Sequence, residues 1–296
     1  MKRRGIGIIC VVLSAVIFGF TPVIAALSYR GGNNGVNMAL IRALVPLPIL
    51  FFLAKSGPPK KINTHQKLTA FFAGVLLFGG TLLLYSSYAF LSVGMATTLH
   101  FLYPIYVALY EALFQHKCLD RLRVCGIILG VIGIVFCSGI GNQMTIDLRG
   151  FGLALVSGFF YAAYILVLSY ESRDPMPLYA LMLNVSIAGV PLCAVVGWLT
   201  NSLTVSLTLQ AWEFAAVAAL LVSIMGCVLF QKGIRCIGDT DAAAFSLLEP
   251  ISSIFFGILL MNDVPKLGTM FGSMMIVAGL FFNAMGERKK VCQSQL

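Results

Sequence analysis

The chain has very little charge for its length. Only 10% of its 296 residues are Asp, Glu, Lys or Arg, whereas 59% are hydrophobic. A soluble domain carries roughly 25% charged residues, because its surface must be polar. The shortage of charge, together with a mean hydropathy of +0.94, excludes an ordinary soluble domain and a disordered chain. The composition predicts an integral membrane protein.

The signatures of common catalytic and metal sites are missing as well. The sequence contains no P-loop, no HExxH, no GxSxG and no Cys/His spacing typical of a zinc site. Its eight cysteines lie in hydrophobic segments or near their predicted cytoplasmic ends, so we expect no disulfide framework. We therefore predict that the chain binds no cofactor and no metal, and that it is not an enzyme.

Ten hydrophobic segments take up almost the whole chain. A transmembrane helix needs about 20 apolar residues, and short linkers with helix breakers separate the segments. The expected transmembrane helices are residues 5–28, 36–54, 68–91, 94–115, 121–140, 150–170, 177–199, 210–231, 239–262 and 266–285. Lys2-Arg3-Arg4 also fits a signal peptide, but the nine later segments favour an uncleaved first helix. The predicted fold class is an all-α integral membrane protein with ten transmembrane helices.

The positive charges predict the orientation in the membrane. If the N-terminus is cytoplasmic, only Arg30, Arg149 and Lys266 fall on the outer side, and Arg42 lies within a segment. All other Lys and Arg residues then lie on the cytoplasmic side, as the positive-inside rule requires. The bias predicts a multi-pass protein of the cell (inner) membrane with both termini in the cytoplasm. It also explains the net charge of +9, so no nucleic-acid partner is expected.

The second half of the chain repeats the first. Residues 96–136 align with residues 242–282 without gaps, and the matches include Pro104 with Pro250 and Gly133 with Gly279. We predict a first five-helix repeat over residues 1–144, and a second repeat with a short cytoplasmic tail over residues 145–296. An odd number of helices inverts the second repeat in the membrane, which is typical of secondary transporters.

The glycine-rich fifth and tenth segments bear on the oligomeric state. Gly126-x-x-x-Gly130 and Gly268-x-x-x-Gly272 mark close helix packing. Such packing occurs within one chain or along a dimer seam, and we favour the first. The expected partners are the lipid bilayer and a small-molecule substrate, and the expected state is a monomer or a weak homodimer.

The chain resembles the ten-helix, EamA-type transporters of the drug/metabolite transporter superfamily over nearly its whole length. The resemblance rests on Phe18-Gly19 in the first segment, Arg42 in the second, Leu102-Tyr103-Pro104 in the fourth and Leu248-Glu249-Pro250 in the ninth. It implies a five-plus-five helical transporter. It does not imply a particular substrate.

Four titratable side chains within the expected helices are candidates for function: Arg42, His100, Glu111 and Glu249. A charged group in hydrocarbon costs about 2.5–3.5 kcal/mol, so such residues usually face the interior of the bundle. Glu249 lies near the membrane midplane, and Ser246 and Ser253 share its helix face. We expect this face to line a substrate cavity, and the alternative is a packing contact with another helix.

The roles of Arg42, His100 and Glu111 stay open at this stage. Arg42 can clamp a carboxylate or anchor its helix. His100 can carry a proton or remain a neutral, hydrogen-bonded residue. Glu111 can act at a gate or pair with Lys117 or Arg121, and we favour the structural role.

Aromatic side chains complete the predicted binding site. Tyr103 and Tyr106 lie too deep for the aromatic belt at a membrane interface, and can hold a cation over their rings. A core stripe of tyrosines is the alternative. Further candidates are Tyr85 and Tyr88 in the third segment, Tyr161 in the sixth and Phe18 in the first.

The sequence therefore predicts a secondary transporter that moves a small polar metabolite by alternating access. An amino acid or a related amine is the expected substrate, and export is the expected direction. Glu249 and tyrosine rings can bind an ammonium group, whereas Arg42 or His100 can bind a carboxylate. One alternative is a carrier of organic cations or quaternary amines that does not use Arg42. Another is a membrane enzyme or a scaffold that transports nothing.

Overall fold

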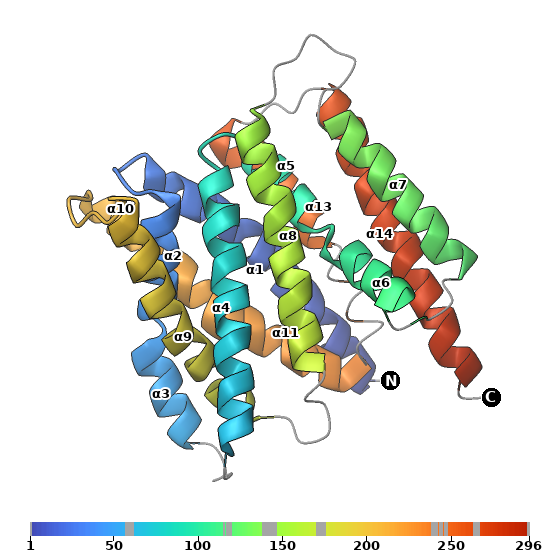
Figure 1. Ribbon diagram of the computed structural model, residues 1–296, viewed down its shortest axis with the longest axis horizontal. Coiled ribbons are helices and arrows are strands. Elements are labelled where there is room, and N and C mark those ends of the chain that lie inside the picture. Colours follow the sequence, from blue (N-terminus) through green and yellow to red (C-terminus); the bar gives the residue numbers. More distant parts are fainter. Residues whose placement is uncertain are drawn as a thin grey trace.

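The computed structural model describes the chain as a bundle of helices (Figure 1). It describes residues 2–294 except 57–61, 115, 117–119, 138–146, 170–175, 238–241, 243–244, 246–247 and 263–266. The first half holds α1 (Lys2–Tyr29), α2 (Gly35–Leu44), α3 (Leu47–Ser56), α4 (Thr64–Ser87), α5 (Val93–His100), α6 (Tyr103–Phe114) and α7 (Arg121–Cys137). The second half holds α8 (Leu148–Ser169), α9 (Leu178–Leu199), α10 (Leu209–Leu220), the π-helical turn η1 (Leu221–Gly226), α11 (Cys227–Ile237), α13 (Leu248–Met261) and α14 (Leu267–Ser294).

Each expected hydrophobic segment contains helix. In the part of the chain that the structure describes, seven helical segments are long and apolar enough to cross a membrane. Two shorter apolar helices, Leu248–Met261 and Met270–Gly286, match the ninth and tenth segments, and α7 matches the fifth. Large apolar side chains such as Phe52, Phe72 and Trp198 are exposed on the outside of the bundle, as lipid contact requires. The ten-helix membrane fold is confirmed.

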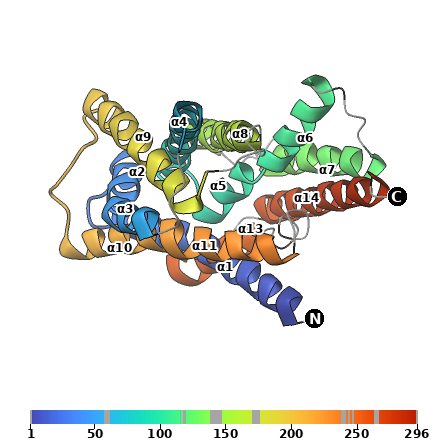
Figure 2. The same cartoon turned by 90° about the horizontal axis from the view of Figure 1, so that it is seen from below.

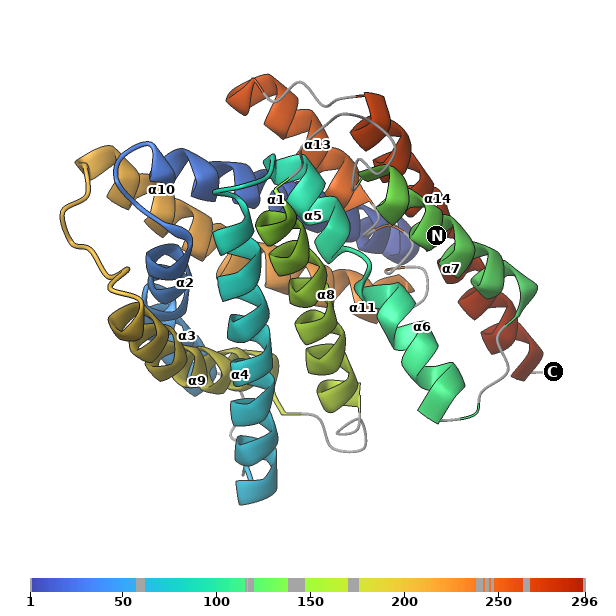
Figure 3. The ribbon, with the colours of Figure 1, turned by 45° about the horizontal axis from the view of Figure 1, so that its top comes forward.

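Within the described residues, three of the spans are interrupted, although the sequence predicted unbroken α-helices. The second breaks at Val45-Pro46 between α2 and α3, and the fourth at Phe101-Leu102 between α5 and α6 (Figure 3). Pro46 and Pro104 explain these two breaks, because proline lacks the backbone donor that would continue a helix. The eighth span passes through η1 between α10 and α11. Irregular backbone at membrane depth is tolerated only where protein buries it or where it lines a cavity.

The contacts between helices have an internal symmetry. α4 packs on α8 and α9, and in the other half α10 and α11 pack on α1, while α10 packs on α2. In the same way, the contact of α5 with α8 has its counterpart in the contact of α13 with α1. If each span of one half is replaced by the equivalent span of the other half, five spans away in the sequence, the same pairs of helices are in contact. Two repeats related by a two-fold axis predict this pattern. The proposed division between residues 144 and 145 stays a prediction.

The fifth and tenth spans pack on each other. α7 and α14 run side by side in both Figure 1 and Figure 2. A Cβ added to Gly279 would lie 2.5 Å from the carbonyl oxygen of Gly126, and one added to Gly133 would lie 2.7 Å from that of Gly272. Glycine is needed here because the two backbones touch. The glycine-rich seam is therefore an internal contact of one chain.

We expect Gly279→Ala to lower the melting temperature of the purified protein and Gly152→Ala to leave it unchanged or raise it. Alanine gains about 1 kcal/mol of helix propensity over glycine, but overpacking a tight contact costs about 1–3 kcal/mol. A Cβ on Gly152 meets nothing within 4 Å, so this variant gains propensity alone. Thermal unfolding in detergent measures both variants, and equal shifts would contradict the tight seam.

Candidate functional site

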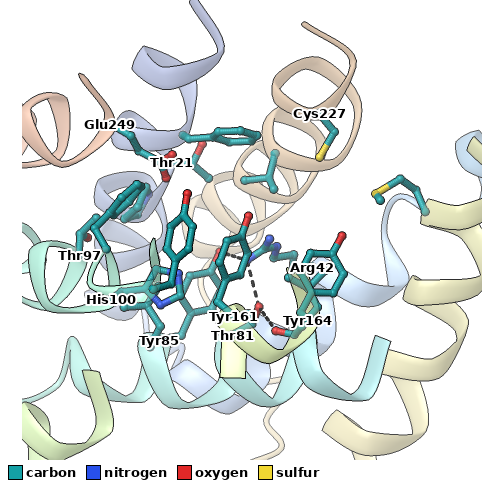
Figure 4. A pocket seen from close by; sticks show the side chains of 18 residues that line it. Thr21, Arg42, Thr81, Tyr85, Thr97, His100, Tyr161, Tyr164, Cys227 and Glu249 are labelled. Atoms are coloured by element: carbon teal, nitrogen blue, oxygen red, sulfur yellow. Dashed lines mark hydrogen bonds between the residues drawn. The ribbon is translucent and has the colours of Figure 1, made fainter. Parts of the chain in front are cut away.

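A cavity of about 140 Å³ lies between the two halves of the bundle (Figure 4). Its wall includes Phe101 at the break between α5 and α6, Val222 in the π-helical turn and Glu249 in the first turn of α13. The break in the fourth span and the π-helical turn of the eighth thus both form part of the cavity wall. An engineered cavity of about 150 Å³ holds benzene, whereas drug-sized ligands need about 300–1,000 Å³. The cavity therefore fits a small metabolite.

Arg42 of α2 supplies a positive charge to this cavity. Its Nη1 donates to the hydroxyl oxygens of Thr81 at 3.2 Å and of Tyr85 at 3.4 Å, both on α4. The guanidinium also lies 5.8 Å from the centre of the Tyr85 ring. Within the described residues, Arg42 forms no ion pair with an acidic side chain. These neutral partners orient the guanidinium without cancelling its charge.

Glu249 supplies an acidic group from α13. α1 crosses directly over its backbone, because a Cβ added to Gly19 would lie 2.6 Å from the carbonyl oxygen of Glu249 and 2.9 Å from the nitrogen of Ser253. The neighbouring Phe18 lines the cavity. This close approach of α1 fixes Glu249 at the cavity wall. In the described part of the chain, the Glu249 carboxylate has no cationic partner.

Aromatic rings from both halves form the wall near these two groups. The ring of Tyr161 lies 4.7 Å from that of Tyr103, 5.2 Å from that of His100 and 5.6 Å from that of Tyr164. Figure 4 shows Glu249 and Arg42 well apart, with tyrosine side chains between them in this view. The cavity thus offers one positive group, one acidic group and a set of polar rings.

Most of the residues singled out from the sequence come together in this cavity. It is lined by Phe18, Arg42, Tyr85, His100, Tyr103, Tyr161 and Glu249. Their part in binding a substrate stays a prediction, since proximity alone does not establish it. Among the described residues, no group of three His, Cys, Asp or Glu side chains gathers in a way that could hold a metal ion.

Three predicted site residues do not line this cavity, and a fourth is outside the described residues. The Tyr106 hydroxyl donates to the carbonyl of Leu155 at 3.4 Å, and Tyr106 does not line the cavity. Tyr103 and Tyr106 both belong to α6, and of the two only Tyr103 lines the cavity. Ser253 is fully buried beneath α1. Tyr88 lines a second cavity, and Ser246 lies outside the described residues.

The sequence-based candidates omitted several residues of the cavity wall, among them Thr81, Thr97 and Cys227. Thr81 had a usable signal, since it precedes Tyr85 by one helical turn and shares its face. Cys227 had none, because a cysteine in a hydrophobic segment is usually a small apolar core residue.

A second, larger cavity of about 690 Å³ lies at the end of the bundle that carries the α1–α2 and α4–α5 connections. Its wall includes Arg30 and Tyr88. The rings of Tyr85 and Tyr88 lie 5.7 Å apart, and the Tyr29 hydroxyl donates to the carbonyl of Tyr85 at 2.7 Å. Because Tyr85 lines the central cavity and Tyr88 the second, this tyrosine pair stands between them.

In the described part of the chain, Glu111 pairs with Arg123, a cation other than the two considered in the sequence, while Lys117 lies outside the described residues. Oε2 of Glu111 lies 2.9 Å from Nη1 of Arg123, and the two side chains are 19% and 5% exposed. Arg121 is exposed, whereas Arg123 points into the bundle, where Gly286 of α14 leaves room for it. Glu111 therefore ties α6 to α7, which agrees with the structural role favoured from the sequence.

Comparison with known proteins relates the whole chain to membrane transporters. A model of the EamA-like transporter family matches residues 5–139 and 148–285. An uncharacterized transporter of Synechocystis is 25% identical over 289 residues, which cover 87% of this chain and 86% of that protein. The threonine/homoserine exporter RhtA of Escherichia coli K12 is 32% identical over 162 residues, or 54% of this chain and 51% of the exporter.

A solved crystal structure shares the fold. It superposes with a TM-score of 0.64 over 94% of this chain and 97% of its own, at 15% sequence identity. At that identity the likeness shows the fold alone.

We expect a small uncharged maleimide to modify Cys227 in the detergent-solubilised protein and to leave Cys193 unmodified. Cys227 lines the central cavity, whereas Cys193 is fully buried in the core. The exposed Cys125 serves as the positive control. Mass spectrometry of the labelled peptides measures all three. Labelling of Cys193 at the rate of Cys227 would contradict a cavity that small solutes reach.

Proposed function

Since the chain belongs to the EamA-like transporter family, we propose that it is a secondary transporter that exports a free amino acid or a closely related amine by alternating access. The chain is a multi-pass membrane protein. The proposal adds that it lies in the cell membrane with both termini in the cytoplasm. The positive charge on the predicted cytoplasmic loops supports this orientation.

One observation carries the choice of substrate: a positive and an acidic group line one small cavity without pairing with each other. Desolvated charges cost several kcal/mol each when they lack a partner. A zwitterion brings both missing partners in one molecule. Its carboxylate can accept paired hydrogen bonds from the guanidinium of Arg42. Its ammonium group can bind Glu249 and the face of a tyrosine ring.

The size of the cavity and the name of one relative also support an amino acid as the substrate. About 140 Å³ is the scale of a benzene-sized ligand, which suits a free amino acid better than a peptide or a drug. RhtA is an exporter of threonine and homoserine by its name, and its similarity covers about half of this chain. Its name supports both an amino acid as cargo and export as the direction.

The symmetry of the helix contacts supports alternating access. When the two halves make equivalent contacts, the bundle can switch between two arrangements of similar free energy, each open to a different side of the membrane. The second cavity lies at the end of the bundle that carries the α1–α2 and α4–α5 connections, and the neighbouring rings of Tyr85 and Tyr88 join its wall to that of the central cavity. In the proposed orientation this end faces outward. The second cavity would then serve as the exit, with the tyrosine pair at its base.

A carrier of organic cations is the second candidate. Glu249 and the tyrosine rings favour it, because a cation needs only a negative charge and aromatic faces. It would make no use of the unpaired guanidinium of Arg42. The charge at Arg42 therefore separates the two candidates. A scaffold that transports nothing would be recognised by the absence of any solute flux.

We expect Arg42→Gln and Glu249→Gln each to lower kcat/KM for amino acid transport by at least about tenfold. Each variant removes a charge-assisted hydrogen bond, which contributes about 1.5–3 kcal/mol, and 1.4 kcal/mol is a factor of ten. Arg149→Gln is the matched control, since Arg149 is exposed and does not line the central cavity. Uptake of labelled amino acids into proteoliposomes measures all three variants.

The outcomes of this experiment separate the candidates. Flux of a quaternary amine that survives Arg42→Gln but not Glu249→Gln would favour the cation carrier. No amino acid crossing faster than in empty vesicles would overturn the proposed substrate class.

A labelling experiment tests the orientation. We expect a membrane-impermeant maleimide to modify Ala89→Cys in intact cells, because Ala89 is exposed at the second cavity. Lys67→Cys lies near the opposite end of α4 and should react only after the cells are made permeable. Wild-type protein gives the background from the native cysteines. The reverse pattern would place the termini outside.

A further inference from the structure

His100 occupies a fixed position in the cavity wall. It is the last residue of α5, directly before the break in the fourth span, and its ring lines the central cavity. The ring Nδ1 lies 2.9 Å from the hydroxyl oxygen of Ser157 on α8. A Cβ added to Gly158 would lie 2.6 Å from the carbonyl oxygen of His100. Because α5 and α8 touch here, the ring has little freedom to move.

The partners of Ser157 determine which ring nitrogen carries the proton. The Ser157 hydroxyl oxygen lies 2.6 Å from the carbonyl oxygen of Ala154, and a carbonyl only accepts hydrogen bonds. A serine hydroxyl has one proton, which is donated to Ala154. Ser157 must then accept from His100, so Nδ1 carries the hydrogen. In the neutral ring, Nε2 is consequently a lone pair that can only accept.

The other polar groups of the cavity leave a particular role for this nitrogen. The guanidinium of Arg42 only donates, and an ionised Glu249 only accepts. The hydroxyls of Thr21 and Thr81 donate to carbonyls of their own helices at 2.6 and 2.9 Å. In the described part of the chain, Nε2 of His100 has no hydrogen-bond partner. Nε2 is thus a neutral acceptor that is open to a group other than the ammonium and carboxylate of a zwitterion, and among the described residues the Thr97 hydroxyl in the same wall is likewise without a hydrogen-bond partner.

We propose that Nε2 of His100 accepts a hydrogen bond from a hydroxyl group on the substrate side chain, so that the transporter selects hydroxylated amino acids over apolar ones of the same shape. Ser157 is the positioning residue that holds the ring in the accepting form. The inference rests on the proposed function, in which Arg42 and Glu249 bind the two charged groups common to all amino acids.

Threonine and valine are the sharpest pair of probes, because they differ only in a hydroxyl that replaces a methyl group. A site built to bind a substrate hydroxyl discriminates strongly against the analogue that lacks it, since a buried polar group is then left unpaired. A methyl group against Nε2 leaves that acceptor unpaired. The wild-type transporter should therefore prefer threonine to valine in kcat/KM by at least about tenfold.

The test compares this ratio in wild type and variants in proteoliposomes. His100→Leu removes the acceptor and should bring the threonine-to-valine ratio close to one. His100→Gln can place its side-chain oxygen near the position of Nε2, so it should retain part of the preference. Ser157→Ala allows the ring proton to move to Nε2 and should lower the threonine-to-valine ratio. Tyr106→Phe is the matched control, because Tyr106 lies outside the cavity, and its ratio should equal that of wild type.

The results distinguish a failure of the proposed role of His100 from a failure of the proposed amino acid transport. Uptake of both amino acids without preference by wild type would overturn the role of His100 alone. So would a ratio that His100→Leu leaves unchanged, since His100 would then contact groups that threonine and valine share. No uptake of any amino acid by wild type would overturn the proposed function as well. If His100→Leu does not fold, the ratios of His100→Gln and Ser157→Ala decide the question, because a purely structural role would not change them.

Discussion

The cost of charge in hydrocarbon is the constraint on which the arrangement of this bundle depends. A charged side chain at the centre of a membrane helix costs about 2.5–3.5 kcal/mol. Arg42 and Glu249 nevertheless lie on membrane-spanning segments from opposite halves, and neither has an ionic partner in the described part of the chain. A cavity that admits water or a polar solute is the physical solution. Glu111 shows the alternative, because it is neutralised by Arg123 at 2.9 Å and ties two helices together.

The irregular backbone of the bundle follows from the same constraint. A cavity within a membrane protein needs polar groups and space, and a continuous helix supplies little of either. The break in the fourth span follows His100, and the residues on either side of it, His100 and Tyr103, both line the cavity. In the eighth span, the Ser14 hydroxyl donates to the carbonyl of Gly226 at 2.9 Å, which closes the π-helical turn against α1. Close packing at Gly19 then holds the opposite wall in place.

Much of the fold could be predicted from the sequence, because hydropathy directly reports which segments enter the bilayer. The breaks at Pro46 and Pro104 also had signals that a closer reading would have used. The π-helical turn had none, since it contains no proline and depends on packing against Ser14. Helix periodicity predicted that Tyr103 and Tyr106 lie near one face of α6, but not which of them reaches the cavity: Tyr103 lines it, whereas Tyr106 donates to the carbonyl of Leu155 on α8. The partner of Glu111 depended on the entry angle of α7, which the sequence does not specify.

The two repeats have similar backbones but different side chains, and these two properties have separate roles in this molecule. The alignment that pairs Pro104 with Pro250 also pairs Tyr103 with Glu249, so one repeat places a ring where the other places an acid. Equivalent backbones allow the two halves to exchange arrangements at a small difference in free energy, as alternating access requires. Unequal side chains give the cavity a charged axis from Arg42 to Glu249. A solute with two unlike ends can then bind in one orientation in both arrangements, because the charges move with the repeats that carry them.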